Sequence, residues 1–447
     1  MTASGGFTAE VAERASGLAF DDLPADVVEV AGQCLLDWFG VTVAGSQEPA
    51  TRIALGAFEP TSTGLTVIGH PVRLPAVEAA VVNGTASHAL DYDDVNEAMV
   101  GHPTVPILAG LLALAESRDS SGADLLCAFV AGYETECRVG RAVGVDHYQR
   151  GFHATGTVGT FGAAAACARL LGLDPPTTAV ALGLAAAQAA GLKSMFGTMT
   201  KPLHAGKAAA NGLLAARLAA GGFTAAPDAI ETSQGFGEAA AGGLDAERGL
   251  RSPRNGWFIL DNLFKYHAAC FQTHSSIEGL RRLRETERFD AGEVESATVH
   301  ADAMQLRMCA IPEPRTGLEV KFSLRHTAAL ALMGRDTSAI ITYTDEAAAD
   351  PDVTAMRDRV TVAEDGEVGG PTPVEVRLRD GRTLQAAHDV SVPEADLGRQ
   401  RALLHDKSSA LIRPVLGDEG TAALLAELDH VEKLDSVAGL MQLAVGR

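Results

Sequence analysis

Apolar residues recur at helical spacing through roughly the first 260 residues of the chain. After Pro24, the side chains of Val27, Val30, Ala31 and Cys34 fall on one side of a helix. The same spacing predicts further helices at about residues 106–116, 123–140, 157–171, 177–192 and 206–220. Their faces are rich in alanine and glycine, and small residues let helix axes approach closely. The pattern therefore predicts a tight, mostly buried helical bundle.

The pattern changes after about residue 270. An apolar, β-branched run at 294–301 predicts a strand. Apolar and charged residues alternate over 374–378, and the turn signal Asp380-Gly381 separates them from a second run at 383–387. That arrangement predicts a β-hairpin. Further helices are expected at about 275–287 and 318–333, and again from residue 394 onward.

Together these patterns predict a mainly α fold with two parts. The all-helical part takes in residues 1–265 and the helical C-terminal segment, residues 398–447. A smaller α/β part, residues 266–397, lies between them in the sequence.

Composition narrows the function classes. The chain has 447 residues and a net charge of −21, which argues against nucleic acid as a partner because phosphate binding needs a basic surface. No uninterrupted apolar run reaches the roughly 20 residues needed to span a bilayer, and residues 1–19 lack the pattern of a signal peptide. We therefore expect a cytoplasmic protein with no membrane partner. The six cysteines form no CxxC pair, so no zinc or iron–sulfur site is predicted.

A first group of candidate residues lies between positions 88 and 103. Asp91, Asp93 and Asp94 stand within four positions, and His102 follows shortly after. Three carboxylates so close together cannot all be buried and ionised without partners. They must therefore pair with cations, bind a metal or face water. For the motif taken alone, a solvated acidic turn is the simplest interpretation.

A second group consists of cationic residues at predicted helix starts. His153 precedes a helix, where backbone N–H groups attract an anion, although a histidine there can equally be a cap or a core residue. Lys201 and His204 lie on a Gly-containing turn before another helix, as does Lys207, and an ordinary helix entry with exposed lysines explains them equally well. Lys265 stands at the expected domain junction, and pockets favour such junctions. Spacing alone leaves open whether these residues meet.

Six segments, in this order, resemble the MmgE/PrpD family, whose members include 2-methylcitrate dehydratase, cis-aconitate decarboxylase and iminodisuccinate epimerase. They are HALDYDD (88–94), GHP (101–103), GFHATGTVGTFGAAAA (151–166), FGTMTKPLHAGKAAANG (196–212), KYHAAC (265–270) and PRTGLEVKFSL (314–324). The resemblance implies a helical domain with an α/β lid, a homodimer, and no metal or organic cofactor. It places the family's active-site positions on Asp91, His102, His153, Lys201 and Lys265.

The chain departs from the family pattern at five positions. Val95 stands where many members have Thr, Thr104 where Ser is frequent, and His267 where a bulky or aromatic residue is common. Lys321 and His326 stand where the decarboxylase-like members carry His and Tyr. We expect six side chains to contact the substrate and to set its identity: Val95, His204, Lys207, His267, Lys321 and His326.

The expected function is that of a cofactor-independent lyase, which forms carbanion or enolate character next to a carboxylate of a small di- or tricarboxylate. His102 is the candidate general acid/base, because an imidazole titrates near neutral pH, with Asp91 orienting it. Lys201, Lys265 and His153 would hold substrate carboxylates and disperse charge. Dehydration of a 2-methylcitrate- or citrate-like acid is the first expectation. An iminodisuccinate-type epimerase, a cis-aconitate-type decarboxylase, a metalloenzyme and a non-catalytic helical binding protein are the alternatives.

Overall fold

The structure is a computed structural model that describes residues 6–446. It divides into two compact units. Of the described residues, the first comprises 6–264 and 394–446, and the second comprises 265–393. The fold is mainly helical with one small sheet in the second unit, so the predicted fold class is confirmed.

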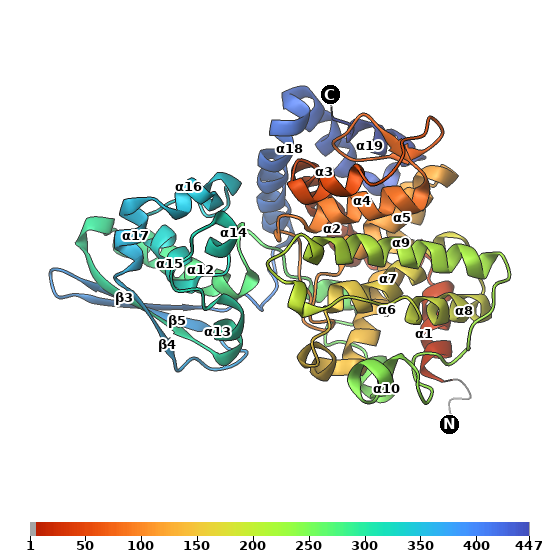
Figure 1. The fold of residues 1–447 in the computed structure, drawn as a ribbon, viewed down its shortest axis with the longest axis horizontal. Coiled ribbons are helices and arrows are strands. Elements are labelled where there is room, and N and C mark those ends of the chain that lie inside the picture. The colour runs from red at the N-terminus through yellow and green to blue at the C-terminus, as the bar shows by residue number, and fades with distance from the viewer. Residues whose placement is uncertain (1–5, 447) are drawn as a thin grey trace. The chain divides into compact units, whose positions relative to one another are not determined.

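The first unit is a bundle of helices from both ends of the chain (Figure 1). Its long helices are α1 (Phe7–Gly17), α2 (Ala25–Gly45), α4 (Ala76–His88), α5 (Thr104–Arg118), α6 (Gly122–Gln149), α7 (Ala154–Leu170), α8 (Pro175–Ala186), α9 (Thr200–Ala220) and α18 (Leu397–Leu428). Its short elements are α3 (Pro49–Leu55), α10 (Phe236–Ala241), α11 (Ala246–Leu250), α19 (Ala438–Leu443) and the paired strands β1 (Leu65–Thr66) and β2 (Arg73–Leu74).

Small residues bring α4, α7 and α9 close together, as the sequence predicts. A Cβ atom on Gly84 of α4 would lie 2.6 Å from the Cα of Gly206 in α9, and one on Gly212 would collide with Ala163 of α7. Only glycine permits this backbone approach. The crossings bring the end of α4 and the first turns of α7 and α9 into one region of the unit.

Helix α9 begins six residues earlier than the 206–220 segment predicted. Pro202 does not prevent this, because a proline in the first turn of a helix removes an N–H group that has no partner there anyway. Lys201 and His204 therefore lie within the helix, and the expected turn before it is wrong.

Helix α2 is the apolar centre of the bundle. Among residues 6–446 it is the one helix long and apolar enough to cross a bilayer by composition, but 83% of its most apolar window is buried inside the protein. It packs against α4 and against α18 from the other end of the chain. All six cysteines are buried and free, including Cys34 in this helix.

The second unit is a four-stranded sheet with helices. The strand order is β4 (Val360–Glu364), β3 (Val294–Ala301), β5 (Thr372–Leu378) and β6 (Thr383–His388), with β3 and β4 parallel and the other pairs antiparallel. Its helices are α12 (His274–Glu287), α13 (Ala303–Cys309), α14 (Gly317–Val320), α15 (Leu324–Leu332), α16 (Asp345–Ala348) and α17 (Pro351–Arg357). The predicted hairpin is confirmed as β5 and β6, and Gly381 supplies the positive φ of 92° in its turn.

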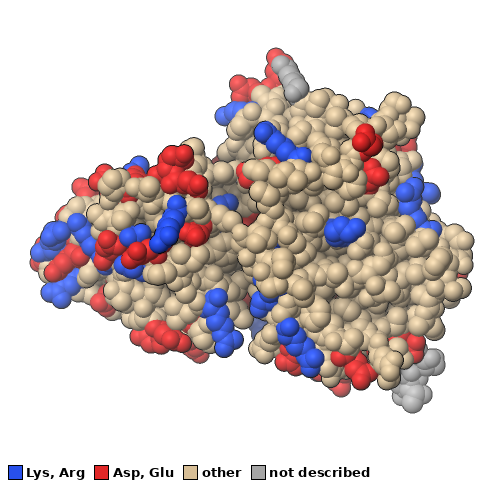
Figure 2. All heavy atoms as spheres, viewed as in Figure 1, with Lys and Arg blue, Asp and Glu red and all other residues tan. Residues whose placement is uncertain are grey.

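Two details of the second unit differ from the sequence prediction or add to it. The helix expected at 318–333 is split into α14 and α15, because Ser323 caps α15 by accepting a hydrogen bond from the backbone N–H of His326. Charged side chains of both signs gather on the face of this unit drawn in Figure 2. Elsewhere in the sheet, Arg377 of β5 pairs with Glu295 of β3. Such charges keep exposed strands from pairing with other chains.

Candidate active site

The loop from Ala89 to Pro103, between α4 and α5, carries the candidate acids and His102. Asp91 adopts a left-handed conformation with φ of 53°, which bends the chain directly after α4. Further on, Asn96 and Gly101 exchange backbone hydrogen bonds of 3.0 and 3.4 Å, which closes a turn. The backbone N–H of His102 then donates to the hydroxyl of Thr155 in the first turn of α7, at 3.1 Å. The loop therefore returns His102 to the acids that precede it.

The three acids are buried, so the solvated acidic turn is wrong. Asp93 and Asp94 are each 1% exposed and Asp91 is 7% exposed. The segment is a loop and not a helix, so Asp91 and Asp94 do not share a helical face. Asp94 lies apart from the other two, because it accepts hydrogen bonds from the hydroxyl and backbone N–H of Thr104. Burial raises the pKa of Asp94 to about 7, although Thr104 opposes the shift.

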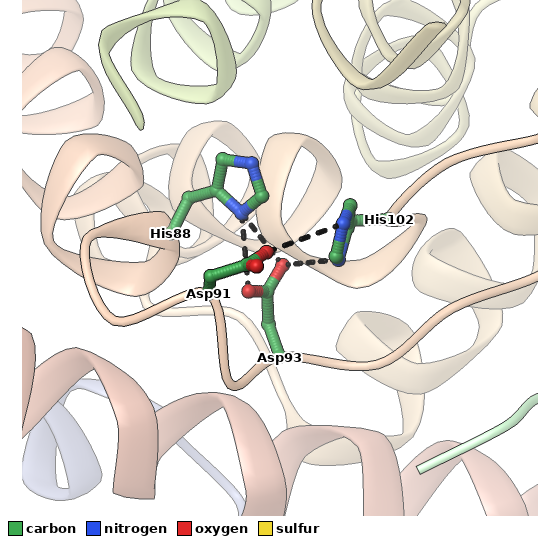
Figure 3. A group of neighbouring side chains, drawn as sticks. All are labelled: His88, Asp91, Asp93 and His102. Carbon is green, nitrogen blue, oxygen red and sulfur yellow. Dashed lines mark hydrogen bonds and ion pairs between the residues drawn. The ribbon is translucent and has the colours of Figure 1, made fainter. Parts of the chain in front are cut away.

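Asp93 lies between two histidines (Figure 3). One of its carboxylate oxygens, Oδ2, lies 2.9 Å from Nδ1 of His88 and 3.0 Å from Nδ1 of His102. Burial alone would raise the pKa of the Asp93 carboxyl, but the His102 and His88 rings hold it well below its usual range. Burial lowers the pKa of His88 to about 4, against the opposing effect of Asp93. The carboxylate is therefore ionised and His88 is neutral near pH 7.

Asp91 joins His102 to a fixed cation. Its Oδ1 lies 2.6 Å from Nζ of Lys201 in the first turn of α9 and 3.7 Å from Nε2 of His102. The two ring nitrogens of His102 thus face two different carboxylates (Figure 3). With 13% of its side chain exposed, the ring can still be reached from outside. This arrangement can store a proton on the ring and release it.

His153 extends the cluster toward α9. It is the N-cap residue of α7 and is 2% exposed, and its Nδ1 lies 3.0 Å from Nδ1 of His204. Its ring stacks at 5.7 Å from the ring of His88 and meets the edge of Phe196 at 4.9 Å. Burial, with the nearby His88, lowers the pKa of His153 well below its usual range. Burial and Lys201 also lower the pKa of His204.

A buried ion pair contacts the backbone of the 89–103 loop. Nζ of Lys407 in α18 lies 2.6 Å from Asp37 of α2 and donates a hydrogen bond of 2.7 Å to the backbone carbonyl of Tyr92. It also lies 3.9 Å from the centre of the Tyr92 ring. Because Tyr92 stands between Asp91 and Asp93, this contact fixes the backbone that presents both carboxylates.

The sequence reasoning missed several of these residues. It assigned no role to His88, Phe196, Asp37 or Lys407, and it did not predict that Asp93 contacts two histidines. A signal for Lys407 was present, because the chain has only seven lysines and this one lies among the apolar positions of a helix.

The donor set His88, Asp91, Asp93 and His102 could also hold a metal ion. One ligand atom from each lies within 4.8 Å of all the others, and imidazole with carboxylate is a set that zinc accepts. An ion bound to Asp91 would compete with the ammonium of Lys201 for the same oxygen. Lys201 therefore already supplies a positive charge where a metal would supply it.

The other predicted positions of the first unit lie at the edge of the cluster or away from it. Val95 is half-buried and pairs through its backbone with Leu263. Lys207 is exposed on α9 and makes no ion pair or hydrogen bond with the described residues of the cluster. His204, by contrast, touches His153 directly.

Four predicted residues belong to the second unit. Lys265 is 1% exposed at its start, and Lys321 is 7% exposed, with its Nζ 5.9 Å from the ring of Tyr343. His267 accepts a hydrogen bond of 2.8 Å from Thr337 at Nδ1 and donates one of 2.7 Å to Glu278 from Nε2. His326 is fully buried, and neither of its ring nitrogens has a hydrogen-bond partner among the described residues.

Comparison with known proteins agrees with this architecture. Residues 9–248 match the MmgE/PrpD N-terminal domain and residues 267–431 match the MmgE/PrpD C-terminal domain. The chain is 27% identical to a cis-aconitate decarboxylase of Aspergillus terreus (strain NIH 2624 / FGSC A1156), over 99% of this chain and 96% of that protein. It is 35% identical to the cis-aconitate decarboxylase of Homo sapiens over 52% of this chain and 49% of that protein. The chain is 26% identical to the cis-aconitate decarboxylase of Mus musculus, over 96% of this chain and 91% of that protein.

A helical bundle with an inserted α/β unit and a buried cluster of His, Asp and Lys defines a class of two-unit proteins. The chain belongs to the MmgE/PrpD family.

Proposed function

We propose that the protein is a lyase that forms carbanion or enolate character next to a carboxylate of a small polycarboxylic acid. The observation that carries the proposal is the position of His102, whose two ring nitrogens face the carboxylates of Asp91 and Asp93. A ring placed in this way can gain or lose a proton without leaving the site. Imidazole is the side chain that most often serves as a general acid or base in enzymes.

Lys201 supplies the charge that such chemistry needs. Its ammonium is held by Asp91 and is largely buried, so it does not have to be organised when a substrate arrives. A fixed cation next to a developing negative charge lowers the barrier, by roughly 3 kcal/mol for one well-placed donor.

Decarboxylation of a cis-aconitate-like acid is the reaction we place first. Relatives with that name match the chain, among them the Aspergillus terreus and Mus musculus proteins over most of its length. In this reaction the bond from carbon to one carboxylate breaks and CO₂ leaves. The electron pair stays on carbon, delocalised toward a neighbouring carboxylate near Lys201. A proton from His102 then completes the product at that carbon.

Dehydration of a 2-methylcitrate- or citrate-like acid is the second candidate, although the sequence alone placed it first. Lys321 and His326 favour it, because they stand where decarboxylase-like members of the family have other residues. Here His102 would remove a proton from carbon and a protonated group would expel the hydroxyl as water. Both reactions use the same cluster, so the product identifies which one occurs.

Proton NMR of the purified protein in D₂O tests the proposal. The panel contains cis-aconitate, citrate, 2-methylcitrate and iminodisuccinate, each with and without EDTA. Conversion of cis-aconitate with release of CO₂ and one deuterium on carbon is the expected result, unchanged by EDTA. Loss of activity with EDTA would favour a metal at His88, Asp91, Asp93 and His102. Absence of conversion and of C–H exchange across the panel would contradict the proposal.

We also propose that the protein is a homodimer, as the family resemblance implies. Composition leads us to propose a cytoplasmic location. Light scattering after size exclusion tests the dimer, since a monomer at micromolar concentration would contradict it.

A further inference from the structure

Asn96 stands in the middle of the 89–103 loop and is 1% exposed. Oδ1 of its side chain accepts a hydrogen bond of 2.8 Å from the backbone N–H of Ala98. Nδ2 donates one bond of 3.0 Å to the hydroxyl of Tyr133 and another of 3.0 Å to the carbonyl of Phe258. Because a backbone N–H only donates and a carbonyl only accepts, these partners fix which end of the amide is the oxygen.

The partners of Asn96 belong to two other segments of the first unit. Tyr133 lies in α6, and its hydroxyl donates a hydrogen bond of 2.7 Å to Oδ1 of Asn262. Phe258 is itself bound to α6, because its backbone N–H donates to Oε1 of Glu134 at 2.6 Å. The amide of Asn96 therefore ties the loop to α6 and to the 258–263 segment.

The backbone around Asn96 strengthens the same connection. Val95 and Leu263 exchange backbone hydrogen bonds of 2.8 and 2.9 Å. Asn96 and Gly101 close the turn that leads the chain to His102. The acids of the loop precede this pairing and His102 follows it. The place of Asn96 thus sets how far His102 lies from the two carboxylates that it faces.

The hydrogen bonds of Asn96 are buried, and each donor and acceptor of its amide is used. A buried polar network that is fully satisfied is rigid and specifies one arrangement. His102 lies 3.0 Å from Asp93 and 3.7 Å from Asp91, and a small shift of the loop would change both distances. A misplacement of about 1 Å in an active site can cost roughly 100-fold in rate.

We propose that Asn96 is a positioning residue, whose side chain holds the loop in the arrangement in which His102 faces Asp91 and Asp93. Asn96 itself exchanges no proton. Without its amide, the loop keeps the contact of His102 with Thr155 but loses the tie to α6 and to the 258–263 segment. The inference rests on the proposed lyase function, because the position of the loop affects the rate through His102.

Two asparagines of the first unit allow a matched comparison. Asn96→Ala removes the amide from the loop. Asn83→Ala removes an amide that is equally buried and that bonds to the backbone of Ile68 and Thr66 at 3.0 Å each. Both variants lose buried hydrogen bonds to the backbone, so both should lose stability. Tyr133→Phe removes one hydroxyl of the network and keeps the ring, which gives a second and milder variant.

At a temperature well below unfolding, we expect kcat of Asn96→Ala to fall roughly 10- to 100-fold, the size of a small misplacement. Tyr133→Phe should fall by less, and Asn83→Ala should stay within a few-fold of the wild type. KM should change little, because the proposed carboxylate-binding residues Lys201 and His153 lie outside the loop. Equal losses of kcat in the two alanine variants would overturn the proposal, and so would a raised KM with normal kcat in Asn96→Ala.

Amide hydrogen exchange, followed by mass spectrometry, tests the positioning without substrate. Peptides that cover residues 89–103 should exchange faster in Asn96→Ala and Tyr133→Phe than in the wild type. In Asn83→Ala the same peptides should exchange at the wild-type rate. Unchanged protection of the loop in Asn96→Ala would overturn the proposal. Faster exchange in Asn96→Ala, with no acid converted by the wild type, would support the positioning of the loop and contradict the proposed function alone.

Discussion

The two units treat their histidines in opposite ways. In the first unit, the ring of His88 lies 4.6 Å from that of His102 and 5.7 Å from that of His153, and these rings face carboxylates or another imidazole from a different segment. In the second, His267 uses both nitrogens in hydrogen bonds with Thr337 and Glu278, and His326 is buried without any. His102 faces a carboxylate at each ring nitrogen, so it can exchange a proton with either. Both nitrogens of His267 are engaged in hydrogen bonds and His326 lies in the core, so these two histidines serve the fold.

The largest expected effect is that of His102→Gln, which keeps polar contacts near Asp91 and Asp93 but cannot transfer a proton. We expect kcat to fall by roughly 100- to 10,000-fold. Thermal unfolding should change little, because the ring is partly exposed. Steady-state kinetics on the converted acid provides the measurement. Activity within a few-fold of the wild type would remove His102 from the mechanism.

Lys407→Met should cost both stability and activity. It leaves the carboxylate of Asp37 buried without its cation, and losing one partner of a buried pair costs about 3–5 kcal/mol. Activity should fall as well, since the carbonyl of Tyr92 loses its donor. Urea unfolding and kinetics at 25 °C measure the two effects.

Lys407→Arg serves as the control, because it keeps the charge and a donor. It should recover part of both losses. An unchanged free energy of unfolding in Lys407→Met would contradict the role of the pair.

His267→Ala tests the histidine that looks most like a site residue in the second unit. The change leaves Thr337 and Glu278 without their partner, which should lower the free energy of unfolding by about 1–3 kcal/mol. The pH dependence of kcat should keep its shape, because both ring nitrogens already serve the fold. A shifted pH profile would show that His267 belongs with the catalytic histidines.

His326→Leu should change the pH dependence of stability and little else. Burial, with Arg357, lowers the pKa of His326 to about 4 in the folded protein. At pH values between about 4 and about 6.5, His326 binds a proton in the unfolded chain but not in the folded chain. Stability is therefore lost as pH falls from about 6.5 toward 4, and the variant should lose less over that window. Urea unfolding of the wild type and the variant at several pH values measures this difference. An equal loss of unfolding free energy in both proteins would contradict the role of His326.

Much of the fold could be predicted from the sequence because its signals are local. Alanine- and glycine-rich helical spacing indicates close helices, and Asp380-Gly381 between alternating runs indicates a hairpin. The start of α9 was missed, since Pro202 was taken to lie before the helix, although its first turn tolerates proline. The split between α14 and α15 was also missed, because one serine cap outweighs an otherwise continuous helical pattern.

The site was harder to predict, because it depends on contacts between distant segments. Asp91, His102, His153 and Lys201 were identified through the family resemblance, and the structure brings them into one cluster. Lys265 belongs to the other unit. Nothing in the local sequence shows that Asp93 serves two histidines while the adjacent Asp94 bonds to Thr104.

The pairing of α2 with α18 has a consequence for synthesis on the ribosome. Asp37 is made well before its partner Lys407 and before α18, which covers this side of α2. At about 5–20 residues per second, the apolar surface of α2 waits tens of seconds for that cover. The loop with Asp91 and Asp93 gains its contact with Lys407 only after α18 has been made.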